Sequence, residues 1–221
     1  MSNDFEKFYR SRHPYGMSYF RDYTKKAGII SPYIIEEHEM NVAQMDVFSR
    51  LMKDRQIMFG TEVDSDSANI IISQLLYLNS ESDSEITIYV NSPGGSVYDG
   101  NGILDTMAFV KADVRTICTG LAASMGSMIL MCGTRGKRSA LPLSRIMIHQ
   151  PLGGCQGQAT EIAIEYDEIM RIREELYSLI CQRTGQPIEK VREDCERDHW
   201  LTAEQAKDYG IIDSVIEITR D

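Results

Sequence analysis

Residues 114–133 read VRTICTGLAASMGSMILMCG, and this stretch decides how the rest of the chain is expected to fold. Val114 to Thr119 predicts a strand that Gly120 ends, and Met125 to Met131 predicts an apolar helix. A turn between strand and helix pushes its side chain out of the packed layer, beside the free N–H groups of the helix start. Ser124, in this turn, is therefore a candidate nucleophile, and the alternative is a serine that only caps the helix.

The length and composition fit one soluble domain with a full core. Of the 221 residues, 43% are hydrophobic and 25% charged, and the net charge of −10 disfavours a nucleic-acid partner. No apolar run is long enough to span a bilayer, and no signal-peptide pattern is visible, so no membrane role is expected. The five cysteines form no CxxC pair, which favours free thiols in a reducing cytoplasm over a metal site or disulfides.

The first 33 residues differ from the rest of the chain. Residues 1–30 carry six Lys and Arg against three acids, whereas the remainder carries a net charge of −13. Many aromatic residues occur without periodicity. We expect residues 1–33 to be a poorly ordered extension or propeptide, with a simple disordered tail as the alternative. The acids argue against an organelle transit peptide. The folded domain is expected over residues 34–221.

Helical and strand patterns alternate along the rest of the chain. The expected helices cover residues 42–53, 66–78 (capped by Ser65), 99–109, 125–131, 160–181, 187–196 and 203–209 (with a Thr202–Gln205 capping box), and the expected strands cover residues 56–59, 85–90, 114–119, 145–149 and 211–218. No internal repeat is visible, and no linker divides the chain after residue 33. This alternation predicts an α/β fold with a mainly parallel sheet.

An activated serine needs a base within hydrogen-bonding distance. Of the four histidines, His13 and His38 lie in or next to the N-terminal extension and are set aside. His149 ends a predicted strand, and the carboxyl ends of parallel strands are where α/β sites are usually built. His199 is the second candidate, in an expected connection between helices, and an edge histidine with a structural role remains the alternative for His149.

The base needs a carboxylate to orient it, and two aspartates compete for this role. Asp194 continues the charged face of a helix with Lys190. Asp198 lies past the end of that helix, where a carboxylate can turn inward, so it is the better candidate. The mechanism would then be attack by Ser124 on a carbonyl carbon, with His149 taking and returning the proton and Asp198 holding the imidazole tautomer.

A second glycine-rich segment, Asn91 to Ser96 (NSPGGS), directly follows a predicted strand. Its two glycines let backbone N–H groups approach a ligand closely. The Gly95 and Met125 N–H groups could together form an oxyanion hole. The alternative is an ordinary Pro-Gly turn.

Two near matches to known motifs are rejected. Residues 133–137 (GTRGK) are not a P-loop, because only two residues separate the glycines. Residues 122–126 (AASMG) are not a GxSxG elbow, because the first glycine is absent. The chain is therefore expected neither to bind ATP by this route nor to adopt the α/β-hydrolase fold.

Taken together, several segments resemble the proteolytic subunit of the Clp protease family (ClpP), in the family's order, over residues 33–218. They are FSRLMKDRQIMFG (48–60), YVNSPGGSVYDG (89–100), GLAASMGS (120–127), the segment 136–162 around MIHQPLGG, and ERDHWLTAEQAKDYGIID (196–213). The resemblance implies that Ser124 is the nucleophile, His149 the base and Asp198 the orienting acid, with separations of 25 and 49 residues. It also implies that Gly95 and Met125 are the oxyanion donors.

The resemblance further implies a crotonase-like spiral of strand–helix turns with a protruding helix–strand handle. In the family, heptameric rings stack in pairs around a closed chamber, and the handle joins the rings. Residues 150–160 and the long helix after them resemble this handle. Its glycines suit a strand with an open edge to which an extended peptide can add. Gln150, Pro151, Leu152 and Gly153 are the expected substrate-binding residues.

The family has no ATPase or cofactor of its own and receives unfolded polypeptide from a hexameric AAA+ unfoldase that uses ATP. By resemblance, Tyr89 matches a position in the apical pocket for this partner, and Leu141 and Ile216 are expected nearby. The N-terminus departs from the family because it is longer and more basic than the usual propeptide.

The favoured function is therefore an ATP-dependent serine endopeptidase working as a compartmentalised ring. One alternative is a catalytically silent scaffold subunit of a mixed ring, against which the intact Ser, His and Asp set argues. The other is a crotonase-fold acyl-CoA hydratase or isomerase, whose relatives usually work with carboxylates and no serine nucleophile.

Overall fold

The computed structural model describes residues 33–38, 41–154 and 156–218. The chain divides into two compact units, one up to Arg50 and one from Leu51 onward. In the first unit, β1 (Tyr33–His38) and β2 (Asn41–Asp46) pair antiparallel. Helix α3 (Val47–Lys53) follows β2 and includes the boundary between Arg50 and Leu51. The helix expected over 42–53 is therefore wrong for residues 42–46, because pairing with β1 overrides the helical pattern. The expected extension lies outside the described residues except for Tyr33, and the domain limit at residue 34 stays a prediction.

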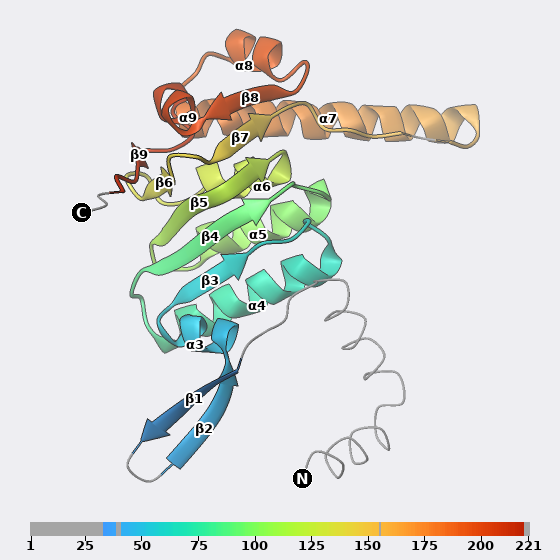
Figure 1. The fold of residues 1–221 in the computed structure, drawn as a ribbon. Coiled ribbons are helices and arrows are strands. Elements are labelled where there is room, and N and C mark those ends of the chain that lie inside the picture. The colour runs from blue at the N-terminus through green and yellow to red at the C-terminus, as the bar shows by residue number, and fades with distance from the viewer. Residues whose placement is uncertain (1–32, 39–40, 155, 219–221) are drawn as a thin grey trace. The chain divides into compact units, whose positions relative to one another are not determined.

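The second unit contains one mixed, mainly parallel sheet (Figure 1). Its strands are β3 (Gln56–Phe59), β4 (Ile86–Ser92), β5 (Val114–Ala123), β6 (Arg138–Ala140), β7 (Arg145–Ile148), β8 (His199–Thr202) and β9 (Ser214–Val215). The order is β3-β4-β5-β6-β9, with β7 beside β5 and β8 beside β7. All of these pairs are parallel except β7 with β8. The expected α/β class is confirmed.

The helices of this unit are α4 (Ser65–Glu81), α5 (Val97–Phe109), α6 (Met125–Met131), α7 (Ala159–Thr184), α8 (Ile188–Asp194) and α9 (Ala203–Tyr209). Helices α4, α5 and α6 follow one another along the sheet (Figure 1). The predicted inward side chains of α4, Ile71, Leu75 and Leu78, are buried in the core. Burial of each such side chain contributes about 1.5–3 kcal/mol to folding.

Of the two predicted helix caps, that of α4 is wrong and that of α9 is confirmed. The predicted cap Ser65 is wrong, because Asp64 caps α4: its carboxylate accepts from the Ser67 N–H at 2.8 Å and its N–H donates to the Ser67 hydroxyl at 3.0 Å. The carboxylate one residue earlier reaches the N–H groups better than the shorter serine. The Thr202–Gln205 capping box of α9 is confirmed.

The short strands were the least predictable elements. Strands β6 and β8 were not expected, so His199 lies in a strand rather than in a connection between helices. The strand expected over 211–218 shrinks to Ser214–Val215. Strands of two to four residues carry too weak a pattern of their own, and their pairing with β5, β7 or β6 decides their structure.

Gly120 bends β5 and does not end it. The residues before Gly120 pair with β6, and the residues after it, 121–123, pair with β7. A bulge against β4 occupies the bend, where the Asn91 side-chain oxygen accepts from the Leu121 N–H at 3.1 Å. A Cβ on Gly120 would lie 2.8 Å from that oxygen. The glycine therefore marks a close approach inside a strand.

Helix α7 extends well beyond the sheet (Figure 1) and corresponds to the helical part of the expected handle. The strand expected before it is not formed. Residues 150–154 and 156–158 are irregular in the described chain. An extended segment needs a neighbouring strand to satisfy its hydrogen bonds, and none pairs with these residues within the described part of one subunit.

Candidate active site

Ser124 lies in the turn between β5 and α6 with an unusual backbone. Its φ of 52° and ψ of −123° make it one of two non-glycine residues with positive φ among those described. Its N–H donates to the Met147 carbonyl at 2.9 Å, and its carbonyl accepts from the Ser127 hydroxyl at 2.7 Å and the Ser127 N–H at 3.0 Å. The hydroxyl makes no capping bond to α6. Strain of this kind, held by the surroundings, is typical of functional sites.

The Ser124 hydroxyl instead faces His149, which directly follows β7. Ser124 Oγ lies 2.8 Å from His149 Nε2, and His149 Nδ1 lies 3.0 Å from Asp198 Oδ1. An ionised carboxylate only accepts, so Nδ1 carries the proton and Nε2 accepts from the serine hydroxyl. The histidine side chain is 12% exposed, and that of Asp198 is 59% exposed. The structure thus brings together all three predicted triad residues.

The sheet explains why these three residues meet. Parallel pairing of β5 with β7 puts Ala123 opposite Met147. Ser124, which follows β5, and His149, which follows β7, therefore lie at the same edge of the sheet. Antiparallel pairing of β7 with β8 brings His199, and with it the preceding Asp198, back to the end of β7. The Gln150 N–H donates to the Cys195 carbonyl at 2.7 Å and its side-chain amide donates to the Glu196 carbonyl at 3.0 Å, which ties down the turn before Asp198.

The second candidates, His199 and Asp194, form a separate cluster. His199 Nδ1 lies 3.9 Å from Asp194 Oδ1, and Asp194 Oδ2 accepts from the Tyr209 hydroxyl and the Lys190 ammonium at 2.8 Å each. Burial raises the pKa of Asp194, but these hydrogen bonds lower it more, so its pKa lies below the usual range. Burial raises the pKa of Tyr209. This cluster packs α8 against α9, and its geometry supports a structural role.

The expected oxyanion donors, Gly95 and Met125, belong to two segments that are in contact, the glycine-rich loop and the start of α6. A Cβ on Gly94 would be 2.9 Å from the Met125 nitrogen, so the glycine-rich loop lies against the start of α6. The Gly94 carbonyl accepts from the Val63 N–H at 2.9 Å, and the Ser96 N–H donates to the Val63 carbonyl at 2.8 Å. In a parallel bridge of this kind, the N–H of Gly95 points away from Val63. The Met125 N–H, at the first helical position, has no acceptor within α6.

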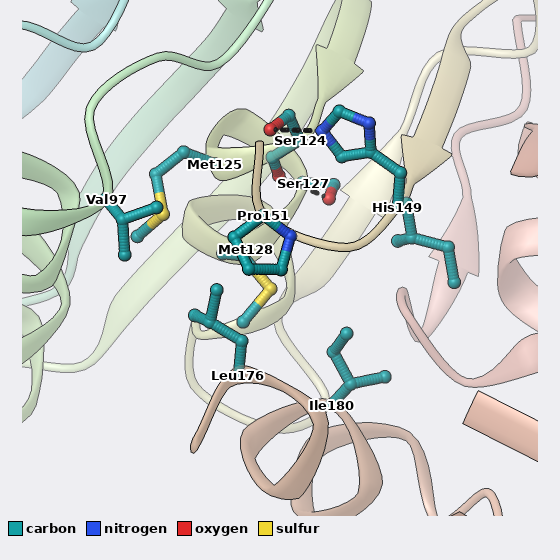
Figure 2. A pocket seen from close by; sticks show the side chains of 10 residues that line it. Val97, Ser124, Met125, Ser127, Met128, His149, Pro151, Leu176 and Ile180 are labelled. Carbon is teal, nitrogen blue, oxygen red and sulfur yellow. Dashed lines mark hydrogen bonds between the residues drawn. The ribbon is translucent and has the colours of Figure 1, made fainter. Parts of the chain in front are cut away.

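A small apolar pocket opens beside the serine (Figure 2). It is lined by Val97, Ser124, Met125, Ser127, Met128, Ile148, His149, Pro151, Leu176 and Ile180. Ser124 and His149 lie at one end, and Leu176 and Ile180 of α7 lie at the other (Figure 2). Most of these lining residues were not predicted. Leu176 and Ile180 are spaced for one helix face, but this spacing does not distinguish a core face from a pocket wall.

A second, larger cavity of about 290 Å³ continues from this pocket and shares Val97 and Pro151 with it. We call it the groove. Three of the four expected substrate-binding residues line it: Pro151, Leu152, which is 84% exposed, and Gly153. Gln150 lines neither cavity and instead holds the turn before Asp198.

The three expected partner-binding residues are only partly gathered. The Ile216 N–H donates to the Ala140 carbonyl at 2.9 Å, so Ile216 lies close to Leu141, the next residue. Tyr89 lies on β4, with β5 between it and β6. Met58, opposite Tyr89 on β3 and 39% exposed, was not predicted. Its sequence signal, an apolar residue on the outer face of a strand, is too common to single out.

The described residues contain neither a candidate metal site nor a candidate membrane span. No group of three or more His, Cys, Asp or Glu side chains there could hold a metal ion. In the same residues, no helix combines the length and apolarity that a membrane span requires.

Comparison with known proteins agrees with the geometry. A sequence model described as Clp protease matches residues 38–219. The chain belongs to the Clp protease family. A Porphyromonas gingivalis protein named "ATP-dependent Clp protease proteolytic subunit" is 54% identical over 221 residues, 99% of both chains. Proteins of the same name from Bacteroides fragilis and Bacteroides thetaiotaomicron are 56% and 55% identical over 192 residues, covering 86% of this chain and 93% and 87% of theirs.

Membership confirms the expected resemblance and fold, and it makes the chain a protease subunit of the Clp type, a hydrolase of protein degradation. The roles of individual residues stay predictions, which the geometry above makes specific.

Proposed function

We propose that this chain is a serine endopeptidase that cuts unfolded polypeptides with Ser124, His149 and Asp198. The observation that carries the proposal is the unbroken chain of contacts, 2.8 Å from Ser124 Oγ to His149 Nε2 and 3.0 Å from His149 Nδ1 to Asp198 Oδ1. His149 takes the serine proton as the hydroxyl attacks the peptide carbonyl, and returns it to the leaving amine. Asp198 holds the tautomer in which Nε2 is free to accept, and it stabilises the imidazolium.

The oxyanion of the tetrahedral intermediate is assigned to the N–H groups of Gly95 and Met125. Both lie where the glycine-rich loop meets the start of α6, next to Ser124. Each preorganised donor of this kind typically lowers the barrier by ~2.7–4 kcal/mol. No cofactor is needed for this chemistry, because the side chains supply the nucleophile and the base.

The pocket beside Ser124 sets the first preference of the enzyme. Its walls are side chains of Met, Ile, Leu, Val and Pro, so it suits an apolar residue immediately before the cleaved bond. Cleavage after acidic residues should be correspondingly slow.

The assembly proposed from the family is two stacked heptameric rings in the cytoplasm, fed by a hexameric AAA+ unfoldase that uses ATP. One feature of the chain supports burial of the handle against other copies. Three large apolar side chains of α7 are exposed in the single subunit, Ile162 at 39%, Ile164 at 69% and Tyr166 at 57%. Met58 and Tyr89 offer an apolar spot on the sheet for the unfoldase.

The experiment is peptide cleavage by the purified assembled chain. Wild-type protein should cut a short peptide after leucine without ATP, and Ser124→Ala should abolish cleavage while native mass spectrometry shows the same assembly. A stably folded substrate should be degraded only with an unfoldase and ATP. Cleavage that persists in Ser124→Ala would refute the assignment. An assembled wild type that cuts no peptide would favour the silent scaffold subunit.

A further inference from the structure

The groove beside the apolar pocket carries charge of one sign. Residues 95–98 form one side, residues 151–154 form the other, and α7 contributes Glu165, Glu168, Ile169 and Ile172. Neither lysine nor arginine lines it. The Gly153 segment lies tightly on α7, because a Cβ on Gly153 would be 2.8 Å from Ile169 Cδ1. This contact fixes the Gly153 side of the groove against α7.

The two glutamates differ in how they are neutralised. Glu168 pairs with Arg171 at 2.8 Å, one turn along α7. The Glu165 side chain is exposed, and its carboxylate has no ion pair or hydrogen bond within the described chain. On the opposite side, a further acidic side chain lies beside Gly95, since a Cβ on Gly95 would be 3.0 Å from Glu62 Cγ. An uncompensated negative charge therefore faces the groove.

Apolar surface accompanies this charge. Ile169 and Ile172 lie on the α7 side, and Tyr98 and Leu152, 67% and 84% exposed, lie on the two other sides. A lysine or arginine side chain matches such a surface, because its methylene stem packs on apolar groups while its charged end reaches a carboxylate. The exposed tyrosine ring adds a second group that attracts a cation.

We propose that the groove is a second specificity site, in which Glu165 selects lysine or arginine in the substrate. The selected position is two residues from the apolar residue held in the pocket beside Ser124. In an extended peptide, residues two apart point to the same side and are ~6.6–6.8 Å from each other. The shared walls Val97 and Pro151 make the two cavities neighbours on that side. This inference rests on the proposed peptidase function.

The expected effect has the size of an exposed ion pair. We therefore expect kcat/KM to be about two- to five-fold higher for a peptide with lysine at the selected position than for one with glutamine there. Glutamate there should be disfavoured further. The preference should weaken as salt is raised, because screening shortens the reach of exposed charges.

The experiment uses the assembled wild-type chain and internally quenched peptides with a single leucine cleavage site. Lysine, glutamine or glutamate is placed two residues before or two residues after that leucine. At one of these positions, kcat/KM should fall in the order lysine, glutamine, glutamate. Glu165→Gln should remove the preference and Glu165→Lys should invert it. Glu175→Gln, an exposed glutamate of the same helix that does not line the groove, is the matched control and should change nothing.

The outcomes separate this inference from the proposed function. If the wild type cleaves after leucine at rates that do not depend on charge at either position, the inference is wrong and the peptidase function stands. It is also wrong if the preference is unchanged in both Glu165 variants, or is lost equally in Glu175→Gln. If no peptide is cleaved by the wild type, the proposed function itself fails.

Discussion

Gly94 and Ser124 are in direct contact: a Cβ atom on Gly94 would lie 2.7 Å from the Cβ of Ser124 and 2.6 Å from the Ala123 carbonyl oxygen. Gly94→Ala should therefore displace the nucleophile. A displacement of about 1 Å in such a site costs roughly 10²-fold. We expect kcat/KM for a short peptide to fall by about that factor, as measured by steady-state kinetics.

The matched control is Gly136→Ala. Gly136 has a similar φ, +82° against +91°, but a Cβ there meets nothing within 4 Å. Both variants should lose about 1 kcal/mol of stability from backbone strain alone, and only Gly94→Ala should lose activity. Equal peptidase activity in the two variants would show that the contact with Ser124 is not important.

Asp198→Asn should lower kcat by about 10²–10⁴-fold, because the amide no longer favours the tautomer with a free Nε2. The thermal midpoint should hardly change, since the Asp198 side chain is 59% exposed. Steady-state kinetics and thermal unfolding measured on one preparation check both expectations. An unchanged kcat would remove Asp198 from the triad.

Asp194→Ala should show the opposite behaviour. It leaves the Tyr209 hydroxyl without its acceptor, at a cost of about 1–3 kcal/mol in the free energy of unfolding. The effect on kcat should be much smaller than that of Asp198→Asn. Loss of activity without loss of stability in Asp194→Ala would reverse the assignment of the two aspartates.

The ion pair between Arg138 and Asp213 should control stability in acid. Its shortest contact is 2.6 Å, and the Arg138 side chain is 5% exposed. Burial raises the pKa of Asp213, but hydrogen bonds from Arg138 and from the Gly136 N–H lower it more, so its pKa is below the usual range. A carboxylate with a lowered folded-state pKa stabilises the fold above its unfolded pKa, about 3.9, and loses this contribution as pH falls through the folded value.

Asp213→Asn should therefore cost about 3–5 kcal/mol at pH 7, where it leaves Arg138 buried without its partner, and less at pH 3, where the wild type has begun to lose this contribution. Denaturant unfolding at both pH values measures this. Asp113→Asn is the control, because its pair with Lys137 is exposed and should contribute much less than the buried pair. Equal losses in the two variants would contradict the account.

The buried thiols should be inert in the folded protein. Burial raises the pKa of Cys132 to about 11 and that of Cys195 to about 12. At pH 8, roughly one in a thousand Cys132 thiols is then a reactive thiolate. Neither cysteine should be alkylated by iodoacetamide within minutes, as peptide mass spectrometry can follow, and both should react after denaturation. Rapid alkylation of the native protein would show that these sites open.

The sequence predicted the triad better than its surroundings. Ser124 and His149 follow strands whose apolar patterns are strong, and both strands were expected from the sequence. The bend at Gly120 was missed because a glycine ends a strand and kinks one with the same local signal. The hydrogen bond from the Leu121 backbone N–H to the side chain of Asn91, thirty positions away, shows that the glycine here kinks the strand.

The cavities could not be predicted in the same way. The pocket and the groove combine residues from α5, α6, the segment after β7, and α7. Leu176 and Glu165 belong to a helix whose periodicity gives its faces but not what each face meets. Such sites come from packing between elements distant in sequence, and so they required coordinates.

The central claim is that the Ser124 hydroxyl is activated by His149 across 2.8 Å. The most direct measurement is covalent labelling of the assembled chain with a fluorophosphonate probe, followed by peptide mass spectrometry. The account predicts one probe on Ser124 in the wild type, much slower labelling in His149→Ala, and no labelling in Ser124→Ala. A wild type that assembles but leaves Ser124 unlabelled, or a His149→Ala variant labelled at the wild-type rate, would contradict it.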